Sequence, residues 1–77
     1  MAKDSAVKFG HYRHYKGKNY QVIGVAKHSE TLEELVVYKA LYNNKVSKLW
    51  VRPKIMFLEE VEVEGKKQLR FKYLGRD

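Results

Sequence analysis

The sequence predicts a mostly β protein, folded as a small, strongly bent antiparallel barrel of five or six short strands with one short helical turn after Pro53. Three observations lead to this prediction. Apolar and polar residues alternate with a period of two in several short segments, and residues typical of tight turns separate those segments. The length of 77 residues leaves room for one domain, whose small core the single Trp, six Tyr and three Phe can fill.

The N-terminal part is expected to contribute an arm and the first strand. Residues 1–8 show no periodic apolar pattern and are predicted to form a flexible arm, which precedes a single domain of residues 9–77. Residues 10–15 are rich in aromatic side chains and are predicted to form a strand. This strand is expected to end at a turn in which Gly17 adopts a positive φ at little energetic cost.

Two longer apolar segments follow. Residues 20–27 predict a second strand, in which the central Gly24 indicates a bulge or a sharp bend. Residues 35–42 are open to two interpretations, because Thr31 could begin a capping box that opens a helix. The β-branched and aromatic residues around Val36 lose side-chain freedom in a helix and favour a strand, which is the structure we expect here.

The C-terminal half is predicted to contain three more strands. Residues 49–52 form a short strand in this prediction, and Pro53 ends it because proline cannot donate a hydrogen bond to a ladder. Proline also suits the first turn of a helix, which we expect over residues 54–57. Residues 59–64 alternate Glu and Val, the pattern of a strand with one wet face, and a Gly-Lys-Lys turn then leads to a last strand over residues 69–73.

The charge balance and the absence of cysteine limit the classes of function. The chain has 16 basic and 9 acidic side chains, a net charge of +7, with the basic excess in residues 3–27 and 66–76. A field of this sign favours anionic partners, although it also serves solubility. Without cysteine, a disulfide framework, a thiolate metal site and a cysteine nucleophile are excluded. The N-terminus does not resemble a signal peptide and no apolar run could cross a membrane, so we expect a cytoplasmic protein without membrane association.

The candidate ligand-binding residues combine arginine or histidine with neighbouring aromatic rings. They are Arg13, His14, Trp50, Arg52 and Arg70. An arginine can clamp an anion through two hydrogen bonds, and a ring beside it can stack on a base. The alternative is structural, with the rings in the core and the arginines paired with carboxylates of the Glu-rich segment. Convergence of Arg13, Arg52 and Arg70 on one face would favour binding, because like charges repel unless they share an anionic partner.

The polar segment from His28 to Thr31 also has two interpretations. His28 and Glu30 could act as a general acid–base pair, which makes them the candidate catalytic residues and further candidates for ligand binding. Ser29 and Thr31 could instead accept hydrogen bonds from backbone N–H groups in a turn, which is the usual role of such residues.

The sequence predicts neither a metal site nor a cofactor. His11 and His14 would point to opposite sides of a strand, which prevents joint chelation, and no spacing matches a zinc signature. The five glycines are scattered singly, so the chain lacks a Gly-rich phosphate loop, and it also lacks a nucleophile elbow.

Several motifs together resemble one known family. They are Tyr-Arg-His-Tyr-Lys-Gly at residues 12–17, His-Ser-Glu-Thr at residues 28–31 and Trp-Val-Arg-Pro at residues 50–53, within a match that extends from Gly10 to Phe71. The family is a group of short bacterial proteins known as domain-of-unknown-function family 1653. The resemblance implies a small SH3-like β-barrel, and it brings no established activity, cofactor or catalytic residue.

The sequence favours a binding module over an enzyme. The first hypothesis is a module for an anionic partner, either a nucleotide-like ligand or single-stranded nucleic acid, because basic charge and arginine–aromatic neighbours occur together. The alternative is a peptide- or protein-interaction module with an aromatic groove. A small enzyme using His28 and Glu30 is the least favoured hypothesis, since a chain of this size has little room for a water-excluded pocket.

Overall fold

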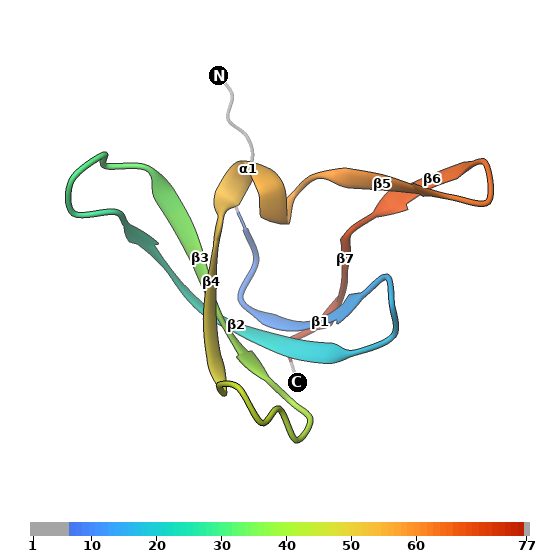
Figure 1. Ribbon diagram of the computed structural model, residues 1–77, viewed down its shortest axis with the longest axis horizontal. Coiled ribbons are helices and arrows are strands. Elements are labelled where there is room, and N and C mark those ends of the chain that lie inside the picture. Colours follow the sequence, from blue (N-terminus) through green and yellow to red (C-terminus); the bar gives the residue numbers. More distant parts are fainter. Residues whose placement is uncertain (1–6, 77) are drawn as a thin grey trace.

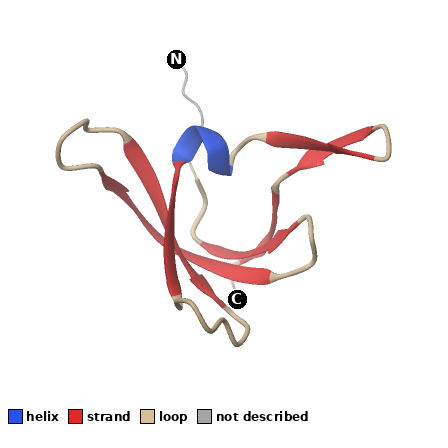
Figure 2. Ribbon diagram, viewed as in Figure 1, coloured by secondary structure: helices blue, strands red, loops and turns tan. Residues whose placement is uncertain are grey.

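Antiparallel β-structure makes up most of the protein, whose computed structural model describes residues 7–76 (Figures 1 and 2). Within these residues the elements are β1 (Gly10–His14), β2 (Asn19–Lys27), β3 (Glu34–Ala40), β4 (Leu49–Pro53), α1 (Lys54–Phe57), β5 (Glu60–Val63), β6 (Lys66–Leu69) and β7 (Phe71–Gly75). One sheet has the strand order β4-β3-β2-β1-β7, and β5 and β6 form a separate two-stranded hairpin. No helix of the described residues is long and apolar enough to cross a membrane.

The segment with two interpretations is a strand. β3 pairs with β2 on one side and with β4 on the other. Buried Val36, Tyr38 and Ala40 alternate with more exposed neighbours, so one face of this strand packs into the core. The hydroxyl of Thr31 accepts the N–H of Glu33 (3.2 Å) in a turn and does not open a helix. The strand prediction is therefore confirmed, and the capping-box interpretation is wrong.

A bulge in the middle of β2 bends the sheet. Val22 pairs with Tyr38, but the next pair joins Gly24 to Val37, so Ile23 is an extra residue on β2. This confirms the bulge predicted from Gly24. The extra residue bends the strand and increases its local twist, which helps to give the five-stranded sheet a concave inner face.

The last predicted strand is in fact two strands, and the chain changes sheet between them at Arg70. β6 pairs with β5, whereas β7 pairs with β1. The N–H of Arg70 donates to the carbonyl oxygen of Glu59 (3.0 Å), and the carbonyl oxygen of Arg70 accepts from the N–H of Tyr15 (2.9 Å). One residue thus joins the hairpin to the sheet, and the described residues form seven strands where five or six were predicted.

The five-stranded sheet is open, with β4 and β7 at its edges. No ladder joins these two strands in residues 7–76, so the predicted barrel does not close. β4 is a poor partner for another strand, because Pro53 has no N–H and the hydroxyl of Ser47 already bonds to the N–H and the carbonyl of Leu49 (3.2 and 2.8 Å). Side chains link the two edges instead. The ring of Phe57 in α1 stacks on Phe71 of β7, with centroids 4.2 Å apart and an angle of 8° between the planes.

The core is aromatic, as the composition predicts. The side chain of Phe57 is 1% exposed, and its ring centroid lies 5.2 Å from that of Tyr12 and 5.7 Å from that of Tyr38. Val22 and Val36 are equally buried and fill the space between the strands. The concave face of the sheet is therefore filled by side chains at its centre, and only its margin is open to ligands.

Residues 1–6 of the arm predicted for residues 1–8 lie outside the described residues. Val7 is buried in the core, and the carbonyl of Lys8 accepts a hydrogen bond from the hydroxyl of Tyr12 (2.8 Å). These two residues therefore pack with the domain.

We expect Phe57→Ala to lower the free energy of unfolding by about 3–5 kcal/mol, because it removes a buried ring and leaves a cavity. Urea denaturation followed by circular dichroism measures this change. Ile55→Ala is the matched control on the same helix, and because its side chain is 78% exposed the substitution should have little effect. A small loss of stability for Phe57→Ala would contradict the role assigned to this ring.

Candidate anion-binding site

A histidine and an arginine contact Phe71 on the concave face of the sheet, and a second arginine is the neighbour of Phe71 in the chain. His14 lies opposite Phe71 in the β1–β7 register, and their ring centroids are 4.9 Å apart. The guanidinium carbon of Arg52, which comes from the other edge of the sheet, lies 5.6 Å from the centroid of the same ring. Arg70 directly precedes Phe71 in the chain. The structure thus brings together three of the residues that the sequence indicates.

The register of β4 explains why Arg52 faces inward. Arg52 pairs with Val36, which is fully buried, and residues directly opposite each other on paired strands share one face of a sheet. The Nε of Arg52 donates to the hydroxyl of Tyr38 at 3.4 Å, which is a long hydrogen bond. No carboxylate of residues 7–76 pairs with Arg52, so among these residues the charge of its guanidinium group is uncompensated.

Arg70 is fixed through its backbone and held by one ion pair. A terminal guanidinium nitrogen lies 3.1 Å from the carboxylate of Glu59. The Nε of Arg70 is buried and has no hydrogen-bond partner among the described residues. A buried donor without a partner costs about 1–3 kcal/mol, so the ion pair with Glu59 leaves the guanidinium group of Arg70 incompletely satisfied.

The surroundings of His14 lower its pKa. Burial contributes most, followed by the positive charges of Arg52, Arg70 and Lys16. The Nδ1 atom of His14 accepts the backbone N–H of Lys16 (3.2 Å), which in the neutral ring leaves the proton on Nε2. At neutral pH the site therefore presents two guanidinium groups and one neutral N–H donor.

Aromatic rings surround these donors. Trp50 pairs with Tyr38 and so lies on the concave face, where it is partly buried. Its indole N–H donates to a backbone carbonyl in the preceding loop (3.0 Å), which fixes the orientation of the ring. The ring of Tyr20 lies 5.8 Å from Phe71 and 6.4 Å from His14, measured between centroids.

Tyr20 and Lys16 are neighbours of the site that the sequence patterns did not indicate. The turn between β1 and β2 pairs Tyr12 with Tyr20 across the two strands. This hairpin register places the rings of Tyr12 and Tyr20 on one face of the sheet. The register can be worked out from the position of the turn in the sequence, so it is the signal that could have placed Tyr20 beside the site. Lys16 follows from the same turn, because it comes two residues after His14.

Arg13 does not join this cluster. It lies between Tyr12 and His14, whose rings both contact the core, so its side chain points to the opposite face of β1. Arg13 is exposed, and its Nε donates to the side-chain oxygen of Asn19 at 3.4 Å. The convergence of Arg13, Arg52 and Arg70 that would have favoured binding is therefore absent, because Arg13 lies on the opposite face of β1.

His28 and Glu30 lie in the turn between β2 and β3, which is on the opposite side of the molecule from the end of β1 that holds His14 (Figure 1). The Nδ1 atom of His28 accepts the backbone N–H groups of Glu30 (3.1 Å) and Thr31 (3.3 Å). Glu30 thus contacts the ring through its backbone and not through its carboxylate. In the described structure these residues form an ordered turn, and the geometry of an acid–base pair is not present.

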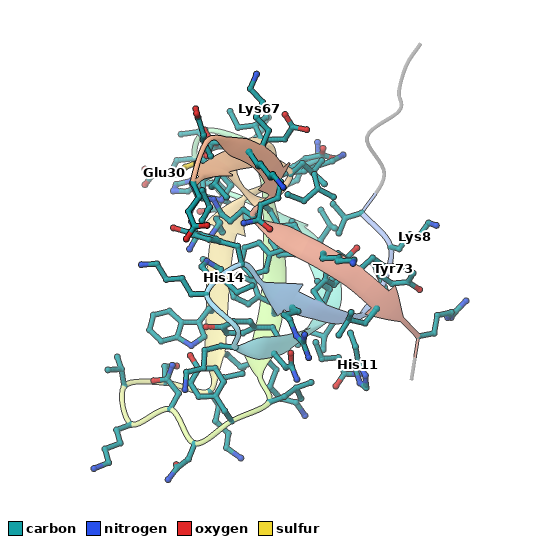
Figure 3. The ribbon with its side chains drawn as sticks, turned by 90° about the vertical axis from the view of Figure 1, so that its right-hand side faces the viewer. Lys8, His11, His14, Glu30, Lys67 and Tyr73 are labelled. Atoms are coloured by element: carbon teal, nitrogen blue, oxygen red, sulfur yellow. The ribbon has the colours of Figure 1, made fainter. Side chains whose placement is uncertain are left out.

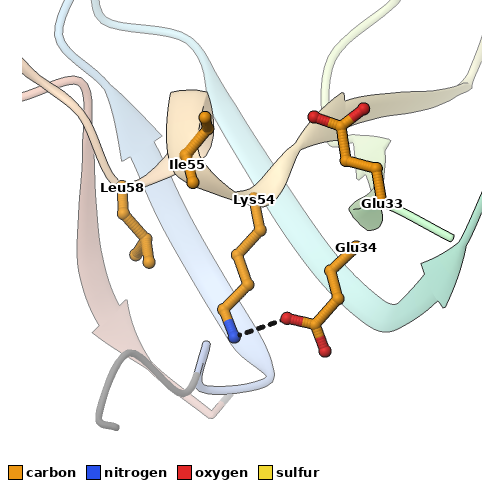
Figure 4. A pocket seen from close by; sticks show the side chains of 5 residues that line it. All are labelled: Glu33, Glu34, Lys54, Ile55 and Leu58. Carbon is orange, nitrogen blue, oxygen red and sulfur yellow. Dashed lines mark hydrogen bonds and ion pairs between the residues drawn. The ribbon is translucent and has the colours of Figure 1, made fainter. Parts of the chain in front are cut away.

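A separate cavity of about 200 Å³ lies between α1 and the beginning of β3 (Figure 4). It is lined by Glu33, Glu34, Lys54, Ile55 and Leu58. The Nζ of Lys54 lies 3.0 Å from the carboxylate of Glu34, and this hydrogen bond and the lysine charge lower the pKa of Glu34. Sites for small molecules usually measure about 300–1,000 Å³, so this cavity suits a single side chain better than a substrate.

Metal binding finds no support in the geometry. Within residues 7–76, no group of three or more His, Asp or Glu side chains is placed to hold a metal ion. Figure 3 shows His11 and His14 well apart.

Arg52→Gln should raise the pKa of His14 toward the ordinary value of 6.5, because it removes a positive charge that disfavours the imidazolium form. An NMR titration of the His14 ring protons against pH measures this shift. Arg13→Gln removes the same charge from the opposite face and should leave the pKa of His14 unchanged. A pKa that responds equally to both substitutions would show that Arg52 has no particular proximity to the ring.

Comparisons with known proteins agree with the family resemblance. The crystal structure of a DUF1653 protein from Bordetella bronchiseptica is similar to this chain, with 37% sequence identity and a TM-score of 0.87. The similarity covers 92% of this chain and 91% of that one. A comparison with curated proteins finds no match. The model of the family described as "Protein of unknown function (DUF1653)" matches residues 10–73, and the chain therefore belongs to the DUF1653 family.

Proposed function

We propose that this DUF1653 protein is a binding module for an anionic ligand, held on the concave face by Arg52, Arg70 and His14. The observation that carries the proposal is the guanidinium group of Arg52 over the same Phe71 ring that His14 contacts, with Arg70 next to Phe71 in the chain. Glu59 is the single carboxylate of the described residues that pairs with either arginine. Like charges in one place are unfavourable unless an anion compensates them. A bound anion would therefore relieve a repulsion that the fold retains.

The donors suit a phosphate group. A guanidinium group presents N–H donors in a fixed fork that matches two oxygens of a phosphate. The guanidinium group of Arg70 and the Nε2 proton of His14 offer further donors for the remaining oxygens. The net charge of +7 attracts such a ligand over a longer range.

The rings beside the donors support a ligand that also carries a planar group. Trp50 lies two residues from Arg52 on the same face of β4, and the ring of Tyr15 lies 4.7 Å from that of His14. Stacking of a base on an aromatic side chain contributes about 1–3 kcal/mol. A nucleotide-like ligand and a segment of single-stranded nucleic acid both combine a phosphate with such a ring.

We further infer that the open sheet is an SH3-like barrel whose edge strands do not pair. The strand order and the bend at the β2 bulge support this inference. The cysteine-free sequence and the bacterial origin of the similar crystal structure support a location in the bacterial cytoplasm.

A second candidate function is a peptide- or protein-interaction module. The observation that favours it is the cavity beside α1, where Ile55 is 78% exposed next to the acidic side chain of Glu33. An apolar hollow of this size fits one side chain of a peptide. Under this alternative, Ile55→Ser would weaken binding of the partner, whereas Arg52→Gln would not. An enzyme based on His28 and Glu30 receives no comparable support.

Titration with AMP should raise the pKa of His14, because a bound anion stabilises the imidazolium form. NMR follows the pKa, and Trp50 fluorescence follows the affinity. Arg52→Gln and Arg70→Gln should each weaken AMP binding about ten- to hundredfold, the loss expected from a charge-assisted hydrogen bond of about 1.5–3 kcal/mol. The affinity of the unaltered protein should fall as the salt concentration rises.

Arg13→Gln is the control for these substitutions, because it lowers the net charge equally on the opposite face. It should leave AMP affinity unchanged. If Arg13→Gln weakens binding as much as Arg52→Gln does, the anion is held by net charge alone and the proposed site is wrong. The same conclusion follows if AMP binds without moving the pKa of His14.

A further inference from the structure

A second group of cationic and aromatic side chains borders the anion-binding site. The Nζ of Lys18 lies 4.9 Å over the centroid of the Tyr42 ring. The hydroxyl of Tyr42 shares a hydrogen bond with the hydroxyl of Tyr20 (2.7 Å) and accepts another from the amide of Asn44 (2.9 Å). The Tyr42 ring is therefore fixed in orientation, and it remains partly exposed.

A row of rings connects this group to the site. Ring centroids are 5.8 Å apart from Phe71 to Tyr20 and 5.5 Å apart from Tyr20 to Tyr42, and both pairs meet edge-on. The two arginines of the site lie at the Phe71 end of the row, and Lys18 lies at the other end. The arginines at one end of the row and Lys18 at the other are therefore separated by two ring-to-ring distances. A ligand with several phosphates can reach both ends, and a ligand with one phosphate cannot.

The loops at the Lys18 end carry basic charge and no acidic residue. Four lysines lie in the β1–β2 turn and the β3–β4 loop, namely Lys16, Lys18, Lys45 and Lys48. The two loops meet where the N–H of Leu41 donates to the carbonyl of Asn19 (3.0 Å). The described acidic residues lie instead in the β2–β3 turn, at the start of β3, and in and next to the β5–β6 hairpin, and Glu59 among them pairs with Arg70. This separation of charge leaves a path for a polyanion from the arginines to the loops.

We infer that the ligand is single-stranded nucleic acid, an inference that rests on the proposed function and names the ligand of the same site. One phosphate lies at the two arginines, a later phosphate of the strand lies near Lys18, and the bases between them lie against the partly exposed rings of Tyr20 and Tyr42. The strand is single because bases in a duplex are stacked on each other and are hidden from aromatic side chains. An acidic peptide would satisfy the cations and leave the rings without stacking partners.

The test compares 5′-thymidine monophosphate with 5′-phosphorylated thymidylate oligomers of two, four and eight nucleotides, with Trp50 fluorescence as the readout of affinity. The tetramer should bind about tenfold more tightly than the monophosphate or better, since it adds stacking and phosphate contacts. Lys18→Gln should weaken tetramer binding and reduce the slope of log affinity against log salt by about 0.7, the value for one phosphate contact in a single strand. It should leave the affinity for the monophosphate unchanged. Lys67→Gln, on the exposed hairpin, is the matched control and should alter neither affinity.

The outcomes separate this inference from the proposed function. If monophosphate and tetramer bind equally and Lys18→Gln has no effect, the single-strand inference is wrong while the anion site stands. Equally tight binding of a duplex of eight base pairs, or of polyglutamate, would also overturn the inference. If Arg52→Gln weakens binding of none of these probes, the proposed function itself fails.

Discussion

The contacts of the Phe71 ring determine both the core and the candidate site. Phe57 stacks on this ring, His14 meets it edge-on, and the guanidinium group of Arg52 lies above it. Because Phe57 follows β4 and Phe71 begins β7, their stack joins two edges that no backbone hydrogen bond joins in the described residues. The same packing brings an arginine from each edge to one histidine. The cationic cluster thus forms because the packing of side chains, and not the pairing of strands, brings the two edges of the sheet together.

Local sequence patterns predict most strands because alternation and turn chemistry act over a few residues. Gly24 indicates the bulge and Pro53 the start of α1 for this reason. The change of sheet at Arg70 has no local signal, since apolar and charged residues alternate without a break from residue 69 to residue 73. Its cause is a pair of hydrogen bonds to Glu59 and Tyr15, and only the tertiary fold brings Tyr15 to that position.

The sequence predicts which types of residue form the site better than it predicts which individual residues of those types belong to it. Alternation on β1 allows either Arg13 or His14 on the inner face, and the choice is made by the packing of Tyr12 against Phe57 (5.2 Å between centroids). The role of His28 is ambiguous in the sequence for the same reason. A histidine whose ring nitrogen accepts two backbone N–H groups, as in this structure, and a histidine that transfers protons can occur in the same sequence pattern. Burial and hydrogen-bond geometry distinguish these alternatives, and both depend on contacts across the fold.

The energetics of the cluster explain how it can persist without a ligand and still be available to one. The attraction between Arg52 and the Phe71 ring is worth about 0.5–2 kcal/mol, and a partly exposed ion pair such as that of Arg70 with Glu59 is worth about 0–1 kcal/mol. Neither interaction satisfies the buried Nε of Arg70 or removes the repulsion that, in addition to burial, lowers the pKa of His14. A phosphate that accepts charge-assisted hydrogen bonds of about 1.5–3 kcal/mol each would therefore replace the Glu59 carboxylate. Because backbone bonds on both sides of Arg70 already hold it in place, this exchange requires side chains to move and leaves the sheet as it is.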